Sequence, residues 1–380
     1  MAEKTLAGSA RWACAYFFAI NGLVHGSLMA RIPALKMQAG LDEGTLGQAL
    51  LCLGLGALTA FPLTGVLQRW LGSRRIVIGG GLLLLLAFPL VGLAHQWLSF
   101  ALAMYLIGLA SGAMDVAVNT QSVEVERALR RPTLSLLHGM YSLGGLVGAL
   151  GAAALVALSP VWHFLLLAVI ALIFLLPGGK RLLPDEHMPA RTHKGSGLRL
   201  PPMAVVGLGL MALCSFVSEG AIADWSALLL HDVKSASEGL SALGYAAFSA
   251  TMVFGRLFGD RLRVRFQDHS LVRALGGLAT LGMVVALLAP DAIISIIGFA
   301  LAGLGLSIIV PILFSAAGNR PGIDPGVGVA AVATLGYGGL LMGPPLIGLL
   351  AQAVGLKLAL LSIVMLCAAL CLRAGIVRRA

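Results

Sequence analysis

The chain has 380 residues, 59% of them hydrophobic and only 11% charged, and its mean hydropathy is +0.96. A soluble globular domain carries roughly 25% charged residues, so this composition excludes an ordinary soluble enzyme or binding domain and indicates a polytopic membrane protein. The net charge of +10 could suggest a nucleic-acid partner, but the positions of the basic residues favour another explanation, given below.

Twelve apolar runs follow one another along the chain. Most are about 20 residues long, the length that a helix needs to cross a ~30 Å hydrocarbon core. The alternation typical of barrel strands is absent. We therefore predict an all-α polytopic membrane protein with twelve transmembrane helices. The predicted spans are residues 11–32, 45–68, 75–94, 97–121, 133–157, 161–177, 203–230, 239–262, 270–289, 292–316, 326–352 and 356–376.

The long connection at residues 178–202 is rich in proline, glycine and charge, which is typical of a polar linker. It divides the chain into an N-terminal six-helix bundle, residues 1–177, and a C-terminal six-helix bundle, residues 203–380. Little sequence remains outside the spans, so we expect no separate soluble domain. The first apolar run is long enough to span and lacks a cleavage site, so we expect a retained helix.

Basic residues are strongly biased to one side of the predicted topology. Of the 26 lysines and arginines, only Arg31, Lys36, Lys234 and Lys357 lie on one side; the other 22, which is 26 minus 4, lie on the side of both termini. Positive residues gather on the cytoplasmic side of membrane proteins, so we predict cytoplasmic termini. This topology accounts for the net charge, and we expect no nucleic-acid partner.

Three short segments recur in the second half of the chain in the same order and at nearly constant offsets of 198, 195 and 194 residues. Such a repeat predicts that the second six-helix bundle duplicates the first in parallel. The pairs are "FAING" at 18–22 with "FVSEG" at 216–220, "LIGLASG" at 106–112 with "LAGLGLS" at 301–307, and "GGLVGAL" at 144–150 with "GGLLMGP" at 338–344.

The loop after the second span reads "GVLQRWLGSRR" at 65–75. The twelve spans and the duplication together resemble the major facilitator superfamily of transporters. This loop is similar to a degenerate form of that superfamily's loop motif. It departs from that motif at Arg69 and Trp70, where the family usually has an acid followed by a base. The residues that match are Gly65, Gly72, Arg74 and Arg75.

The matching loop of the second half, "GRLFGDRLRVR" at 255–265, keeps Gly255 and an acid, Asp260, beside Arg261. The resemblance implies that both loops form a conformational latch, stronger in the second half. The alternative is that their basic residues only anchor the topology.

Four further segments are similar to the YbjJ-type bacterial inner-membrane transporters, a branch related to fucose permease. The resemblance implies a bacterial inner-membrane location, alternating access, and a cavity lined by the first, fourth, seventh and tenth spans. It says little about the substrate. The segments are "ARIPALK" at 30–36, "MDVAVNTQSVEVE" at 114–126, "RPTLSLLHGMYSLGGLVGA" at 131–149 and "EGAIADWSALLL" at 219–230.

Ionisable side chains at membrane depth are candidates for function because they are costly in lipid. We expect the lipid-facing third, sixth, ninth and twelfth spans to lack them. The four that we assign to proton coupling are His25, Asp115, His138 and Glu219.

The helical rise places His25 and Glu219 at a similar depth, roughly 5 to 6 Å to the periplasmic side of the midplane. We therefore predict that both side chains face one cavity, and Glu219 also matches Asn21 in the repeat. Asp224 is predicted at a wet outer rim instead, about 140° around the helix from Glu219.

Asp115 and His138 are predicted at a similar depth toward the cytoplasmic end of their helices. One interpretation is an inner polar pair that takes part in coupling. The alternative is a contact between helices that only stabilises the first half.

Polar and aromatic side chains near these groups are predicted to bind substrate. Trp225 has an alternative role as an anchor at the membrane interface, and Tyr245 begins nearer the outer surface than the others. The predicted substrate-binding residues are Asn21, Asn119, Tyr337, Trp225 and Tyr245.

Together these features predict a secondary active transporter that moves a small polar solute such as a sugar, coupled to protons. Glu219 is the predicted proton carrier because a partly dehydrated carboxylate takes up a proton more readily than one in water. The alternative is efflux of an amphipathic or drug-like compound by proton antiport. Fucose permease-type symporters use acids on the first and fourth spans, whereas this chain has Asn21 on the first, so their mechanism does not transfer simply.

An intramembrane enzyme is disfavoured, because the sequence lacks His-Glu-x-x-His, a Gly-x-Ser-x-Gly elbow and a phosphate-binding loop. A sensor on the same fold stays an alternative. The expected partners are a small-molecule substrate, protons and the lipid bilayer. We expect a monomer with no catalytic residues, no metal site and no cofactor.

Overall fold

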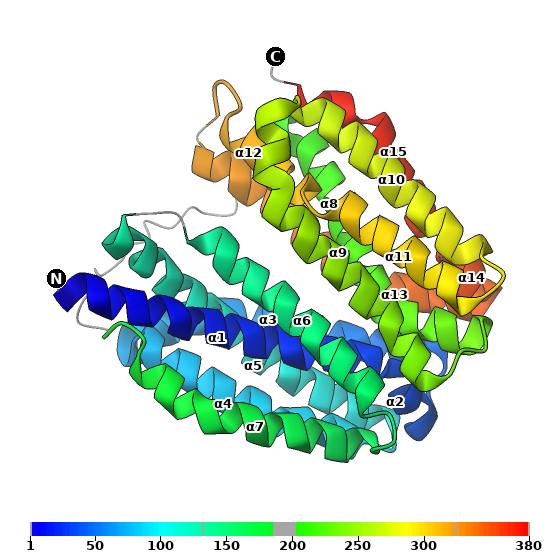
Figure 1. Cartoon of the computed structure of the whole chain (residues 1–380), viewed down its shortest axis with the longest axis horizontal. Helices are drawn as coiled ribbons and strands as arrows, with labels where there is room; N and C mark the ends of the chain where they lie inside the picture. The colour runs from blue at the N-terminus through cyan, green and yellow to red at the C-terminus, as the bar shows by residue number, and fades with distance from the viewer. Residues whose placement is uncertain (1, 131–132, 185–202, 324, 379–380) are drawn as a thin grey trace. The chain divides into compact units, whose positions relative to one another are not determined.

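The computed structural model describes residues 2–130, 133–184, 203–323 and 325–378. Within these ranges the chain is helical and contains no strand, as Figure 1 shows. It forms two compact units, residues 1–192 and residues 193–380, here called the N-terminal and C-terminal units. Their boundary falls inside the expected linker 178–202, of which residues 185–202 lie outside the described part. The predicted all-α fold with two helical halves is confirmed.

The N-terminal unit consists of six long helices and one short one. Helix α1 packs mainly against α6, α3 against α5, and α4 against both α5 and α7. The short helix α2 follows the first span in the segment "IPALKMQ". The helices are α1 (Ala2–Ala30), α2 (Ile32–Gln38), α3 (Glu43–Leu71), α4 (Ser73–Gly92), α5 (Trp97–Leu129), α6 (Leu134–Ala154) and α7 (Pro160–Lys180).

Glycines allow α1 and α6 to touch backbone to backbone. A Cβ atom on Gly22 would lie 1.9 Å from the carbonyl oxygen of Tyr141, and one on Gly144 would lie 2.1 Å from that of Ala19. Small residues let membrane helices approach in this way, since lipid supplies no hydrophobic force between them. The glycine-rich run "GGLVGALG" is therefore an interface for α1.

The C-terminal unit repeats this plan with more interruptions. Helix α8 packs against α13, α9 against α11, and α10 against α11 and α15. Its elements are α8 (Met203–Leu228), a π-helical turn (Leu229–Val233), α9 (Glu238–Arg265), α10 (Asp268–Leu288), α11 (Ala292–Leu306), α12 (Ile309–Gly318), α13 (Pro325–Val354), α14 (Leu356–Ala359), α15 (Leu361–Leu372) and a 3₁₀ turn (Ala374–Val377).

Two expected spans are divided in the structure. The span 292–316 breaks between α11 and α12, where Ile308 has φ −118° and ψ 4°. The span 356–376 divides into α14, α15 and the 3₁₀ turn. The first break has a local cause: Pro311 has no backbone N–H to donate to the carbonyl of Ser307, four residues earlier, and its ring clashes with that carbonyl. No proline or glycine lies between α14 and α15, so the sequence pattern did not indicate that junction.

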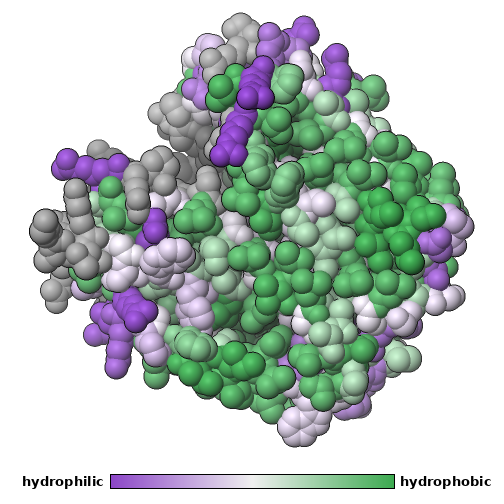
Figure 2. Space-filling view, in the orientation of Figure 1, coloured by the Kyte–Doolittle hydropathy of each residue, from purple (hydrophilic) through white to green (hydrophobic). Residues whose placement is uncertain are grey.

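Ten helices of the described chain are long and apolar enough to cross a membrane, and the apolar helical segment Leu356–Leu372 is shorter. The face drawn in Figure 2 is largely hydrophobic, with hydrophilic residues gathered toward its margins. A helix forms hydrogen bonds between its own backbone polar groups, so helices with a hydrophobic surface are stable in the hydrocarbon core of a lipid bilayer. The chain is an integral multi-pass membrane protein.

Candidate functional site in the C-terminal unit

Glu219 of α8 faces a basic residue of α9. Its Oε2 atom lies 3.6 Å from Nη2 of Arg256, and the two side chains are 19% and 32% exposed. The other carboxylate oxygen, Oε1, is buried and has no hydrogen-bond partner among the described residues. An ion pair therefore joins α8, one of the ten long apolar helices, to α9, which matches the predicted span 239–262 but is not among those ten.

The break between α11 and α12 contributes to this pair. The Nε–H group of Arg256 donates to the carbonyl oxygen of Ser307 over 3.4 Å, a long bond, at the residue directly after α11. The neighbouring Gly255 brings α9 close to the same point, because a Cβ atom there would lie 2.1 Å from the Ser307 hydroxyl oxygen. Gly255, predicted in the loop motif, thus acts here as a packing residue for Arg256.

Two further polar side chains complete this group, which we call the α8–α9 cluster: Glu219, Asp224, Tyr245 and Arg256. Tyr245 is buried, forms a hydrogen bond with Ser249, and lies within electrostatic reach of the other three members. Asp224 is 7% exposed. The prediction that Asp224 is wet is wrong, because its side chain is buried, whereas its place near the outer end of the predicted span 203–230 stays a prediction.

The aromatic residues predicted to bind substrate differ in exposure. Tyr337 is 48% exposed, and its ring stacks on Phe216 with centroids 5.1 Å apart. Trp225 is fully buried, and its indole N–H has no hydrogen-bond partner among the described residues. A buried ring cannot anchor the chain at the membrane interface, so only the binding role of Trp225 stays a prediction.

In the N-terminal unit, the predicted binding amides make contacts within the protein. The hydroxyl of Ser111 on α5 donates to Oδ1 of Asn21 on α1 over 2.7 Å, and Asn21 is 5% exposed. The amide of Asn119 donates to the backbone oxygen of Asp115 over 2.9 Å. These contacts show what holds the amides in place, and substrate contact stays a prediction for both.

The predicted pair of Asp115 and His138 is not joined by a hydrogen bond or ion pair among the described residues. Asp115 is partly exposed, and the ring of His138 lies 5.0 Å from that of Phe18. His25 lies 6.3 Å from Tyr141, ring centroid to ring centroid. His25 and Glu219 belong to different units, so their predicted shared cavity stays a prediction.

The first loop motif stabilises helix ends. Gly72 ends α3 with φ 77°, a left-handed value that glycine adopts without a steric cost. Arg74 donates to the carbonyl oxygens of Gly179 and Lys180 at the end of α7, over 3.0 and 3.2 Å. A Cβ atom on Gly65 would meet nothing within 4 Å, and Arg75 is exposed.

The second loop motif is only partly described. The side chain of Asp260 lies outside the described residues, so the predicted latch is untested there. The guanidinium of Arg261 lies 5.3 Å from the ring centroid of Phe258.

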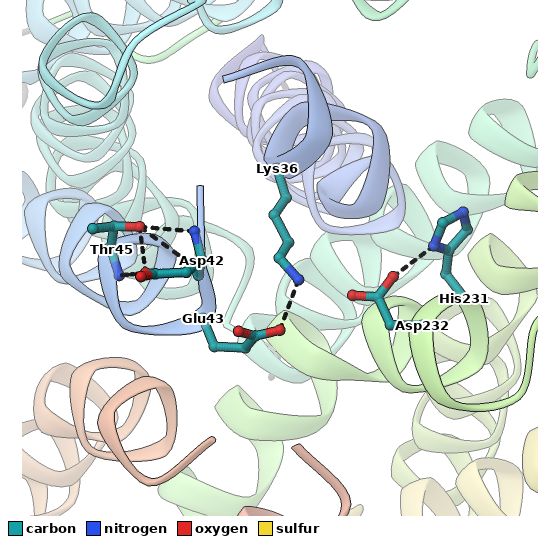
Figure 3. Close-up of polar contacts among 6 residues, drawn as sticks. All are labelled: Lys36, Asp42, Glu43, Thr45, His231 and Asp232. Atoms are coloured by element: carbon teal, nitrogen blue, oxygen red, sulfur yellow. Dashed lines mark hydrogen bonds and ion pairs between the residues drawn. The ribbon is translucent and has the colours of Figure 1, made fainter. Parts of the chain in front are cut away.

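In each unit, short polar contacts also lie at the helix ends away from the loop motif (Figure 3). In the N-terminal unit, Lys36 pairs with Glu43 over 2.8 Å, and Asp42 and Thr45 form a capping box at the start of α3. In the C-terminal unit, Nδ1 of His231 lies 2.7 Å from Oδ1 of Asp232. These contacts fix the ends of helices rather than line the α8–α9 cluster.

Two ionisable residues were missed by the sequence analysis. Arg256 was counted only as a topological charge, although its place inside the predicted span 239–262 could have drawn attention to it. His163 lies on α7, which matches a span expected to lack ionisable side chains. It is fully buried, and neither ring nitrogen has a hydrogen-bond partner among the described residues.

A family model for the Major Facilitator Superfamily matches residues 12–344. The chain therefore belongs to this superfamily and is a membrane transporter.

Curated relatives match nearly the whole chain. An uncharacterized MFS-type transporter of Yersinia pestis is 36% identical over 346 residues, which cover 90% of this chain and 89% of that protein. The uncharacterized transporter y4wD of Sinorhizobium fredii is 37% identical over 345 residues, with 90% and 91% covered. These relatives support the superfamily and name no substrate.

Solved structures show the same fold at low identity. A mutant of the nucleoside transporter NupG superposes with a TM-score of 0.78 and 10% identity, covering 97% of this chain and 100% of that chain. The E. coli fucose:proton symporter FucP, also a mutant, gives a TM-score of 0.62 and 17% identity, with 97% and 98% covered.

Proposed function

We propose that this transporter moves a small polar solute together with protons, and that Glu219 binds the transported proton. The single observation that carries the proposal is the ion pair of Glu219 and Arg256, 3.6 Å apart between α8 and α9. Ionisable groups inside membrane spans are rare because they are costly, and they commonly mark ion and substrate pathways.

The pair offers a simple means of coupling. While Glu219 is ionised, Arg256 supplies its counter-charge, and removing either charge leaves the other poorly compensated in a low dielectric. Protonation of Glu219 therefore weakens its electrostatic interaction with Arg256. A change of about 1.4 kcal/mol in that interaction alters the ratio of two conformations tenfold, which is enough to bias alternating access.

The contact with Ser307 connects the pair to a movable element. Arg256 reaches the junction at which α11 ends and α12 begins. Discontinuous membrane helices commonly form coupling sites in transporters, since their free carbonyl groups interact with charge. We infer that release of Arg256 from Glu219 shifts α12 relative to α11.

Tyr337 is the best candidate for substrate contact, because it is exposed and stacked on Phe216. An aromatic ring with a hydroxyl group suits a sugar, which presents both C–H faces and hydroxyl groups. Phe314 lies 6.5 Å from Phe216 and adds a third ring. This aromatic group also favours the second candidate function, efflux of an amphipathic compound by proton antiport.

The remaining expectations are part of the same proposal. The 22 to 4 distribution of basic residues, from a total of 26, supports cytoplasmic termini, and the YbjJ-type resemblance supports a bacterial inner-membrane location. The four segments given in the sequence analysis support the YbjJ-type branch. We propose a monomer that needs no cofactor, with residues 1–177 and 203–380 as its two moving bundles.

The test begins with a thermal-shift screen of monosaccharides, nucleosides and amphipathic cations on the purified protein. The compound that stabilises it is then used in liposomes at two pH values. We expect Glu219→Gln to retain counterflow exchange and to lose accumulation driven by a proton gradient. The matched control is Glu124→Gln, which removes a carboxylate paired with Arg127 at 2.7 Å. Unchanged accumulation in Glu219→Gln would disprove the assignment.

A further inference from the structure

A cavity of about 630 Å³ lies at the end of the C-terminal unit where α9 ends and α10 begins. Its wall also includes Ser315 of α12 and the chain segment that follows α15. It contains none of the four members of the α8–α9 cluster, so it is separate from the proposed transport site. The volume lies in the range of ligand pockets, roughly 300 to 1,000 Å³.

The charged residues in this cavity are not balanced. Arg263 donates two hydrogen bonds to Asp268, from Nε to Oδ1 over 3.0 Å and from Nη2 to Oδ2 over 3.1 Å, so the carboxylate is already neutralised. Arg378 lies 3.1 Å from Nε2 of His269, again with Nη2 as the donor. Among the described residues the contact of this guanidinium is thus an imidazole and not a carboxylate.

The cavity wall is also amphipathic. Val264 and Phe266, both on its lining, are 89% and 55% exposed. Arg265 is exposed beside them, and Arg320 donates to the backbone oxygen of Arg378 over 3.4 Å. A cationic pocket bordered by exposed apolar side chains at a helix end fits a ligand with an anionic head and an apolar body.

We propose that this cavity binds a phosphate group, held by Arg378 and by Nδ1–H of His269, the ring nitrogen that carries the proton while Nε2 accepts from Arg378, and that the group belongs to an anionic phospholipid headgroup. Guanidinium groups bind phosphate through directed, charge-assisted hydrogen bonds. The apolar lining favours a lipid over a free phosphorylated solute. This end of the unit carries the C-terminus, which the distribution of basic residues predicts to be cytoplasmic, where anionic lipids attract basic pockets (Figure 1).

The experiment is native mass spectrometry of the full-length protein titrated with phosphatidylglycerol or phosphatidylcholine. The variant is Arg378→Gln, and the matched control is Arg373→Gln, an exposed arginine five residues earlier that does not line the cavity. We expect phosphatidylglycerol binding to weaken about fivefold in Arg378→Gln and less than twofold in Arg373→Gln. Phosphatidylcholine binding should be weak and equal in all three proteins.

A second arm separates the two sources of phosphate. Thermal shifts are measured with inorganic phosphate and with glycerol 3-phosphate. If these solutes stabilise the protein in an Arg378-dependent way while lipid binding is unchanged, the phosphate site stands and the lipid assignment is wrong. If Arg378→Gln and His269→Gln match the Arg373→Gln control in both arms, the cavity binds no phosphate and the proposal is overturned.

Discussion

The repeated segments Phe18–Gly22 and Phe216–Gly220 place polar residues at the same position but use different chemistry. Asn21 accepts a neutral hydrogen bond from Ser111, whereas Glu219 pairs with Arg256. The basic partner is also present in only one half. The position after Gly65 in α3 is Val66, whereas the matching position after Gly255 in α9 is Arg256. The duplication therefore conserves the position of the polar side chain, while the charge at that position differs between the two halves.

The last glycine of each segment differs as well. A Cβ atom on Gly22 would meet the backbone of Tyr141 at 1.9 Å, while one on Gly220 would meet only the side-chain Cδ1 atom of Leu340 at 2.7 Å. A leucine side chain can rotate away, whereas a helix backbone cannot move alone. The N-terminal unit is thus built on rigid close packing at this position, and the C-terminal unit has room to adjust.

The largest expected effect follows from this contrast. Gly22→Ala should lower the free energy of unfolding by about 3 kcal/mol, because α1 and α6 must separate to admit the methyl group. Gly220→Ala should cost below about 1 kcal/mol, since the leucine can repack and alanine favours a helix. Unfolding by SDS titration measures both. Equal losses in the two variants would contradict the contrast between the units.

The second prediction concerns the ion pair. Arg256→Gln should lower the free energy of unfolding by about 2 kcal/mol, less than for a fully buried pair, because both side chains are partly exposed. The double variant Glu219→Gln with Arg256→Gln should recover at least half of that loss, since no charge is then left alone. A double-mutant cycle with the same SDS titration provides the coupling energy, and strictly additive effects would show that the two residues do not interact.

The neutral counterpart in the N-terminal unit should have a smaller effect. Ser111→Ala removes the donor to Asn21 and leaves a nearly buried amide oxygen unsatisfied, for an expected cost of about 1 kcal/mol. Ser99→Ala on the same helix is the control, since Ser99 is exposed and donates only to the backbone of Gln96. Equal stability of the two variants would show that the hydrogen bond between Asn21 and Ser111 does not stabilise the fold.

Hydropathy predicted most of the fold, because spans are long apolar runs and turns are short. It did not predict the break between α11 and α12, because the run is apolar throughout; the signal there is Pro311, which cannot donate to the carbonyl of Ser307 four residues earlier. The candidate site was only half predicted. Depth along α8 indicated Glu219, and the place of Arg256 inside the predicted span 239–262 could have indicated that residue too. The contact between them could not be predicted, because it joins two helices and leaves no local signal in one sequence.

The smallest expected effect lies outside the spans, at the capping box of α3 (Figure 3). Hydrogen bonds from the side chain and backbone of Thr45 hold the pKa of Asp42 below its ordinary value of 3.8. A lowered pKa in the folded state stabilises the protein above the unfolded pKa, and this contribution is lost as pH falls through the folded pKa. Asp42→Ala should therefore cost about 0.5 kcal/mol at neutral pH and less in acid.

Asp42→Asn is the control for this cap. Asparagine caps a helix nearly as well but does not titrate, so the Asp42→Asn variant should lose less stability in acid than the parent protein, by the share that Asp42 contributes. SDS titrations at neutral pH and near pH 3 provide the comparison. An identical acid dependence in the parent protein and in Asp42→Asn would exclude the carboxylate as its source.

The most direct test of the central claim needs no substrate. Infrared difference spectra recorded while pH is changed report the carbonyl band of a protonated carboxyl group inside the protein. We predict a band that is absent in Glu219→Gln, present in Glu124→Gln, and displaced in its titration midpoint in Arg256→Gln. Spectra in which Glu219→Gln and Arg256→Gln titrate as the parent protein does would contradict the assignment of Glu219 and Arg256 as the proton-binding pair.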